Sequence, residues 1–301
     1  MKLFALVFIL ISFIVSTNDS LIQTEKKPDS DTLKYIFISH LYQWYSGGKK
    51  VDLRVEQLNL SSYSGIWLGG DVCSEAAQSF TTLEYIDNLF DLSNTLTLWT
   101  LGNHDTRNFN MEWISEFTNK NSYYTTHSNG ITYIVLNTNF VPYDCENIDN
   151  QYRLLTNVCD TISTSSHLII LMHHGIISNV SGVPQPDTYA HTNYSYWNAN
   201  CYSADSNFAN TIYPKLVKVK QKGIDVICIV GDMGSLHKTI ELTSPDSIKI
   251  LGCGLNNSYF LDSVELSQAD KDKVLIFKHI PEIRKLFWNF CDLDSLLESQ
   301  N

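Results

Sequence analysis

The chain has 301 residues, of which 44% are hydrophobic and 18% charged, so its composition excludes a disordered chain and allows a sizeable buried core. The formal net charge is −11, without a block of lysines and arginines, which argues against nucleic acid as a partner because such binding depends on neutralising phosphates. A small phosphorylated molecule stays compatible with this charge, since a metal ion can hold it on an acidic surface.

The first 17 residues have the pattern of a secretory signal peptide. One lysine, Lys2, precedes an apolar run from Leu3 to Val15, and small polar residues follow. The run has the length of a signal peptide rather than of a membrane span. We therefore expect residues 1–17 to be removed, the mature chain to be secreted or extracytoplasmic, and no stable membrane span to remain. An uncleaved N-terminal anchor is the alternative.

The strongest strand signals are apolar runs with β-branched and aromatic residues. These runs predict strands at 33–39, 64–68, 96–101, 167–172 and 225–230. Apolar residues at helical spacing predict helices between and after these strands. They are expected at 51–60, 76–92, 111–119, 152–163 and 208–222. The alternation favours an α/β architecture with parallel strands joined by helical crossovers.

Other segments complete this order. A hairpin is expected around Asn129-Gly130, while 137–150 is polar and irregular. The long segment 176–207, rich in polar and aromatic residues, predicts a lid or a binding loop, with a disordered insert as the alternative, and a second, shorter loop over the site is expected at 42–50. The tail predicts three closing strands and then a helix. They are expected at 248–251, 258–261 and 274–279, with the helical tail at 281–301.

Seven cysteines are compatible with an oxidising compartment, although their odd number leaves at least one thiol free. Cys73 and Cys228 are expected to pack as small hydrophobic residues. If a pair is oxidised, it should come from Cys145, Cys159 and Cys201, which lie in polar surroundings. A fully reduced set is the alternative.

Side chains that bind metals follow five of the predicted strands. They are His40, Asp71, the run Asn103-His104-Asp105, the pair His173-His174, and Asp232. Carboxylate and imidazole groups are ligands of divalent transition metals, and the carboxyl ends of strands in an α/β sheet are where ligands bind. Each residue also has a simpler interpretation. Asp71 could cap a helix, Asn103 could form a turn, and one of the two adjacent histidines is expected to be a core residue.

The order of these motifs resembles the calcineurin-like metallophosphoesterases over about residues 34–260. The family pattern is Asp-x-His, Gly-Asp, Gly-Asn-His-Asp/Glu, a histidine at a strand end, and Gly-His-x-His. Residues 70–71 (Gly-Asp) and 102–105 (Gly-Asn-His-Asp) match outright, and 172–174 (Met-His-His) matches well. Residues 38–42 (Ile-Ser-His-Leu-Tyr) and 231–234 (Gly-Asp-Met-Gly) stand where the first and last motifs would be, and both differ.

The resemblance implies an α/β fold of the four-layer α-β-β-α sandwich type, here over residues 33–280. It also implies hydrolysis of phosphomonoesters or phosphodiesters with divalent Mn, Zn or Fe. In the family, Asp71 would bridge two metal ions, and Asn103 and His173 would bind the second. His104 would be the acid that protonates the leaving oxygen, and Asp105 would orient it.

The altered first and last motifs decide what site is expected. The aspartate of the first motif and both histidines of the last are absent, so a conventional two-metal centre cannot be assembled. However, His40 in an aspartate position and Asp232 in a histidine position are complementary changes, whereas simple decay would leave alanines, serines or apolar residues. A register with Ile38 in the aspartate position fits the strand end less well.

We therefore expect a rearranged site with one firm metal ion, bound by His40, Asp71, Asn103, His173 and Asp232, and a second ion left open. The predicted function is a secreted hydrolase of small phosphorylated substrates. The alternative is a catalytically degenerate binding protein with the same fold. His237 is expected to be an ordinary polar residue, and the sequence indicates no oligomeric state.

Overall fold

The computed structural model describes residues 32–107, 110–140, 144–177, 179–184, 197, 205–233, 237–255, 267 and 269–300. The chain clusters into two units, Met1–Ser30 and Asp31–Asn301, and every element below belongs to the second unit. The predicted signal peptide at 1–17, most of the predicted loop at 176–207 and the predicted strand at 258–261 lie outside the described residues.

The first of two mixed sheets has five strands in the order β11-β10-β1-β2-β3. β1, β2 and β3 run parallel, whereas β10 is antiparallel to β1, and β11 to β10. The bounds are β1 (Leu33–Ile38), β2 (Gly65–Leu68), β3 (Thr97–Trp99), β10 (Lys273–Ile280) and β11 (Lys285–Asp292). The strands β1 to β3 were predicted from their apolar runs, and the structure confirms them within a few residues.

The second sheet has six strands in the order β4-β5-β6-β7-β9-β8, of which β5, β6, β7 and β9 run parallel. The bounds are β4 (Tyr124–Ser128), β5 (Ile131–Val135), β6 (His167–Met172), β7 (Asp225–Val230), β8 (Thr239–Thr243) and β9 (Lys249–Cys253). The predicted hairpin is confirmed as β4–β5. Its turn residues Asn129 and Gly130 have φ angles of 51° and 76°, the positive values that this tight turn requires.

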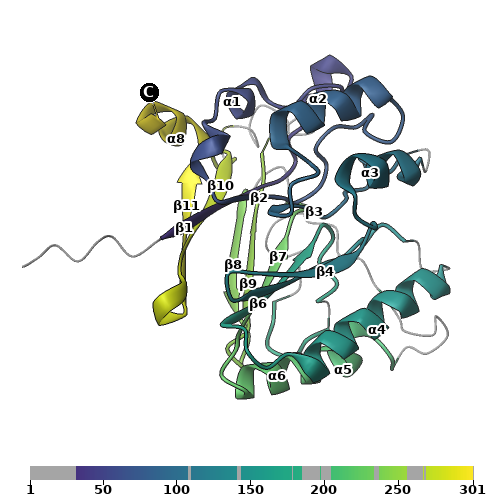
Figure 1. The fold of residues 1–301 in the computed structure, drawn as a ribbon, viewed down its shortest axis with the longest axis vertical. Helices are drawn as coiled ribbons and strands as arrows, with labels where there is room; N and C mark the ends of the chain where they lie inside the picture. The colour runs from purple at the N-terminus through teal and green to yellow at the C-terminus, as the bar shows by residue number, and fades with distance from the viewer. Residues whose placement is uncertain are drawn as a thin grey trace, which may run out of the picture. The chain divides into compact units, whose positions relative to one another are not determined.

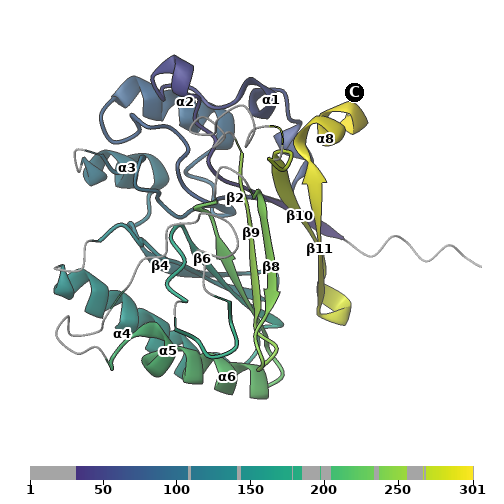
Figure 2. The ribbon, with the colours of Figure 1, turned by 180° about the vertical axis from the view of Figure 1, so that it is seen from behind.

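Helices cover the outer face of each sheet (Figures 1 and 2). On the five-stranded sheet they are α1 (Leu53–Glu56), α2 (Phe80–Phe90), α3 (Met111–Thr118) and α8 (Leu293–Gln300); on the six-stranded sheet they are α4 (Cys145–Thr161), α5 (Phe208–Thr211) and α6 (Tyr213–Gln221). Short 3₁₀ turns lie at Trp44–Ser46, Leu60–Ser62 and Pro281–Ile283. None of the helices within these ranges is long and apolar enough to cross a membrane.

Three clusters of buried apolar side chains hold the layers together. One lies between the first sheet and its helices and includes Ile38 and Leu83. Another lies between the second sheet and its helices, as with Ile170 and Leu155. The third lies between the two sheets and includes Trp67. Burial of large apolar side chains is worth about 1.5–3 kcal/mol each, so these clusters fix the spacing of the layers.

Four predictions about elements were wrong. The helix predicted at 51–60 is limited to α1, a single turn, because the chain then forms the 3₁₀ turn at Leu60–Ser62. The helix α4 begins at Cys145 rather than at 152, because the Asp144 side chain accepts a hydrogen bond from the Asn147 N–H and caps it. The helix predicted at 208–222 is divided into α5 and α6 at Ile212, two residues before Pro214. The predicted helical tail at 281–301 is helical only from Leu293 onward, apart from a 3₁₀ turn, because β11 extends the first sheet.

The cysteines divide into a disulfide and free thiols. Cys145 is disulfide-bonded, as expected for one of the polar candidates, and Cys201 lies outside the described residues. Cys159, another candidate, is instead a free, buried thiol on the same helix as Cys145. Cys73 and Cys228 are free and buried, as predicted.

Candidate metal centre

The predicted ligands lie just beyond the carboxyl ends of five strands. His40, Asp71 and Asn103 follow the parallel strands β1, β2 and β3. His173 and Asp232 follow the parallel strands β6 and β7 of the other sheet. The two sheets therefore supply ligands to one place, as the order of the motifs predicts.

Glycines let the strand ends come this close. Gly231 follows β7 and packs against Gly69, which follows β2. A Cβ atom on Gly231 would overlap the carbonyl oxygen of Gly69. A Cβ atom on Gly102 would overlap the Asp71 carboxylate. Any larger residue at either position would push the strand ends apart.

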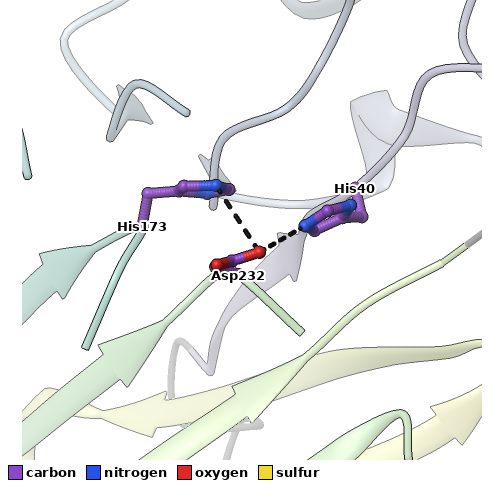
Figure 3. A group of neighbouring side chains, drawn as sticks. All are labelled: His40, His173 and Asp232. Carbon is purple, nitrogen blue, oxygen red and sulfur yellow. Dashed lines mark hydrogen bonds and ion pairs between the residues drawn. The ribbon is translucent and has the colours of Figure 1, made fainter. Parts of the chain in front are cut away.

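His40, His173 and Asp232 form the centre of the site (Figure 3). Their ligand atoms all lie within 4.8 Å of one another, so the group could hold a metal ion. His40 Nε2 is hydrogen-bonded to Asp232 Oδ1 at 2.9 Å, and His173 Nε2 lies 3.9 Å from the same oxygen. All three residues are buried, with exposed fractions of 5% or less.

Asp71 and Asn103 extend this group on the side of His173. His173 Nε2 lies 3.5 Å from Asp71 Oδ1 and 3.3 Å from Asn103 Oδ1, and His40 Nε2 lies 3.6 Å from Asp71 Oδ2. Ligand atoms about 2.0–2.1 Å from a tetrahedral ion lie about 3.3–3.5 Å from one another. The two spacings from His173 Nε2 lie in this range, and the His40–Asp71 distance is slightly longer. Asp71 Oδ2 is buried and has no hydrogen-bond partner, which leaves a carboxylate oxygen for an ion to satisfy.

The protonation of His173 suits a metal ligand. Burial lowers its pKa to about 4, so its imidazole is neutral near pH 7. Its Nδ1 lies 2.8 Å from the carbonyl oxygen of Gly69, which places the proton on Nδ1 and leaves the Nε2 lone pair facing Asp71. A backbone carbonyl that orients the far nitrogen in this way is a common feature of metal-binding histidines.

His40 and Asp232 each shift the pKa of the other toward its charged form. Burial lowers the pKa of His40, but the attraction of Asp71 and the hydrogen bond to Asp232 outweigh burial and raise the pKa above its usual value. Burial would raise the pKa of Asp232, yet the neighbouring histidines hold it well below its usual range. Without a metal ion, this pair carries opposite charges and satisfies itself.

Of the two adjacent histidines, His173 belongs to the central group and His174 lies beside it. The His174 backbone N–H donates to Thr138 Oγ1 at 2.8 Å, and its ring lies edge-on to His173. Its Nε2 is 3.8 Å from Asp232 Oδ2, so His174 borders the centre. His237, expected to be an ordinary polar residue, pairs with Asp270.

Asp105 does not have the role that the resemblance implied. Its carboxylate accepts hydrogen bonds from the backbone N–H groups of Asp71, Val72, Cys73 and Gly102, and from the Trp99 indole N–H. It therefore fixes the backbone around Asp71 rather than the His104 ring. Burial and the charge of Asp71 raise the pKa of Asp105, while the five donors favour its ionised form.

His104 faces the centre from its solvent side. Its Nε2 lies 3.9 Å from Asp71 Oδ2, and its backbone N–H donates to Asp71 Oδ1 at 2.9 Å. The Tyr42 ring stacks on it, with ring centres 4.7 Å apart, and Trp44 packs against it edge-on. Burial lowers the pKa of His104, and the nearby Arg107 charge acts in the same direction.

Sequence reasoning missed four residues that hold His104: Tyr42, Trp44, Ser74 and Arg107. The position of Tyr42 could have indicated it, because Tyr42 stands where the first family motif has its histidine. The predicted loop at 42–50 does lie at the site, since Tyr42 and Trp44 belong to it. The other contacts depend on how loops fold back, which leaves no pattern in the sequence.

The exposure of the site divides it into two parts. The central group and Asp71 are buried, whereas Asn103 and Arg107 are exposed and His104 is partly exposed. A ligand from solvent would therefore meet Asn103, His104 and Arg107 first.

No protein-family model matches the chain, and no curated protein matches it either.

Proposed function

We propose that this chain is a secreted, metal-dependent phosphoester hydrolase of the calcineurin-like metallophosphoesterase type, with a rearranged metal site. The proposal includes the four-layer α-β-β-α sandwich of that family. Three apolar clusters, two of them under helices and one between the sheets, support this architecture. The succession of ligands along five strand ends supports the family.

One observation carries the proposal: imidazoles from both sheets converge on the buried Asp71 carboxylate, His173 on Oδ1 and His40 on Oδ2, and Oδ2 has no hydrogen-bond partner. A buried, unsatisfied oxygen costs about 1–3 kcal/mol or more, so its retention indicates a use for it. Binding of a cation is the use that the surrounding imidazoles and carboxylates favour.

The residues that would hold a divalent Mn, Zn or Fe ion are Asp71, Asn103, His173 and Asp232, and His40 would be a fifth ligand. A divalent ion held there would supply polarisation of a phosphoester oxygen and activation of water near neutral pH. Asp71 would hold the ion from the buried side of the site, and Asn103 would hold it from the exposed side.

His104 is the residue that we assign to the leaving group. Its Nδ1 lies 3.5 Å from Ser74 Oγ and its ring packs against both Tyr42 and Trp44, so Nε2 stays directed at the centre. Nε2 accepts from Arg107 in the structure, so it must first take up a proton from solvent, which it then donates to the leaving oxygen as the phosphoester bond breaks.

Secretion is part of the proposal. The pattern of residues 1–17 predicts export, and the disulfide at Cys145 is typical of proteins in oxidising compartments. Both observations would be unusual for a chain that stays in a reducing cytosol.

The test compares the wild type with Asp71→Asn, His104→Ala and the control Asp160→Asn, an exposed surface residue paired with Lys215. Each is assayed on an aryl phosphomonoester and the matching diester with added manganese, zinc or iron. We expect Asp71→Asn to lose both metal and activity. His104→Ala should keep the metal and lose about 10²–10⁴ in turnover, and the control should match the wild type.

The alternative function is a binding protein that keeps the fold without catalysis. The direct hydrogen bond between His40 and Asp232 favours it, because that pair is satisfied without an ion. Equal background rates for the wild type and Asp71→Asn on both substrates would reject the hydrolase in favour of this alternative.

A further inference from the structure

Arg107 is a cation at the exposed side of the candidate metal centre. Its Nη2 donates to His104 Nε2 at 3.2 Å, and His104 Nε2 in turn lies 3.9 Å from Asp71 Oδ2. Its guanidinium is therefore two contacts away from the carboxylate at the centre. Lys238, another cation near the site, is 0% exposed and pairs with Asp272, so it is held inside the fold.

Ser74 lies beside Arg107 and is fixed in place. Arg107 Nη1 donates to Ser74 Oγ at 3.3 Å, and the same hydroxyl lies 3.5 Å from His104 Nδ1. Ser74 is only 8% exposed, and Gly48 packs so closely on it that a Cβ atom on Gly48 would overlap the serine side chain. The hydroxyl and the guanidinium are thus presented together.

The charge of the site makes a cation at this position important. Asp71, Asp105 and Asp232 place three carboxyl groups around the ligand atoms, and the whole chain carries a formal charge of −11. A phosphate dianion that approaches one divalent ion must overcome this negative field. It gains more from a nearby arginine than a diester does, because a diester carries a single negative charge.

The shape of the guanidinium adds to this preference. Its planar set of N–H donors can pair with two oxygens of one phosphate group, and such charge-assisted pairs are about twice as strong as neutral hydrogen bonds. A monoester offers three terminal oxygens and inorganic phosphate four, so at least two remain for Arg107 even if one binds a metal ion. A diester offers only two terminal oxygens in total.

We propose that Arg107, with the Ser74 hydroxyl, binds the terminal oxygens of phosphate at this centre and makes the site selective for phosphomonoesters over diesters. The inference rests on the proposed function and names its substrate class. When phosphate takes the guanidinium, Arg107 leaves His104 Nε2, which still lies 3.3 Å from the Tyr42 hydroxyl.

The first experiment measures binding and needs no turnover. Calorimetric titration of the zinc-loaded full chain with inorganic phosphate compares the wild type with Arg107→Gln and Arg107→Lys. Arg153→Gln is the matched control, because Arg153 lies on α4 and donates to Asn150 there. Metal content is measured for each protein, so that a loss of zinc is not mistaken for a loss of phosphate binding.

We expect Arg107→Gln to weaken phosphate binding by about tenfold or more, Arg107→Lys to fall between, and Arg153→Gln to match the wild type. Phosphate binding that is unchanged in Arg107→Gln, or absent in the zinc-loaded wild type, would overturn the inference.

A second experiment measures kcat/KM for an aryl monoester and the matching diester. Arg107→Gln should reduce the monoester value by about tenfold more than the diester value. Equal losses on the two esters would also overturn the inference. If the wild type binds phosphate through Arg107 but hydrolyses neither ester, the proposed function fails while the phosphate site stands.

Discussion

Replacement of Asp105 by asparagine separates the role that the structure gives this residue from the role that the family resemblance implied. Oδ2 of Asp105 accepts from the N–H groups of Asp71 and Gly102 at 2.7 and 2.8 Å and from the Trp99 indole at 3.3 Å. Oδ1 accepts from Val72 and Cys73 at 2.7 and 3.2 Å. Both oxygens are therefore fully used as acceptors.

Asparagine offers one acceptor oxygen, and its amide nitrogen would face N–H donors on the other side. In the better of its two orientations, the Val72 and Cys73 N–H groups lose their acceptor. Two buried N–H groups without partners cost about 1–3 kcal/mol each, so Asp105→Asn should lower the free energy of unfolding by about 2–6 kcal/mol. That is a large part of the stability of about 5–15 kcal/mol that is typical of a domain.

The assay is urea unfolding of the metal-free protein at pH 8, with Asp160→Asn as the control for an exposed aspartate. Removing the metal ion ensures that any loss comes from the protein alone. The control should change the free energy of unfolding by less than about 1 kcal/mol. If Asp105→Asn lies within about 0.5 kcal/mol of the wild type, the hydrogen-bond reasoning is refuted. A loss of turnover at unchanged stability would restore the orienting role.

Three further predictions concern the site, pH and processing. Exchanging both residues of the hydrogen-bonded pair, His40→Asp with Asp232→His, should keep more zinc than either single change. If the double variant keeps no more zinc than the single variants, the two residues are not coupled in metal binding. Burial lowers the pKa of His167 to about 4. As the pH is lowered from 6.5 to 4, the unfolded chain therefore takes up a proton that the folded chain does not, and the free energy of unfolding falls. His167→Gln should therefore lose about 1–2 kcal/mol less between pH 7 and 5 in urea unfolding, and an identical loss would count against this assignment. Mass spectrometry of exported protein should show that residues 1–17 are absent, and an intact Met1 would indicate an anchor.

The strands were predictable where local sequence decides the structure. The runs that became β1, β6 and β7 are apolar and buried, and Asn129-Gly130 allows the positive φ angles of the hairpin turn. β8 and β11 were missed because both are edge strands with exposed residues among the apolar ones, so their patterns are weak. Their place depends on the neighbouring strand rather than on their own composition.

The candidate site was predictable as a set of ligands but not as a network. The order of strand ends placed His40, His173 and Asp232 together, and the structure brings them within 4.8 Å of one another. The role of Asp105 was not predictable, because its main partners are backbone N–H groups, which every residue type but proline carries. The position of Arg107 depends on a turn that returns to Ser74.

The central claim is that the chain binds a divalent metal ion. Its most direct test is the metal content of the purified full chain after dialysis against zinc or manganese, measured by inductively coupled plasma mass spectrometry. The account expects about one ion per chain in the wild type and almost none in Asp71→Asn, since the unpartnered carboxylate oxygen is lost. A wild-type content below about a tenth of an ion per chain, or equal content in Asp71→Asn, would contradict it.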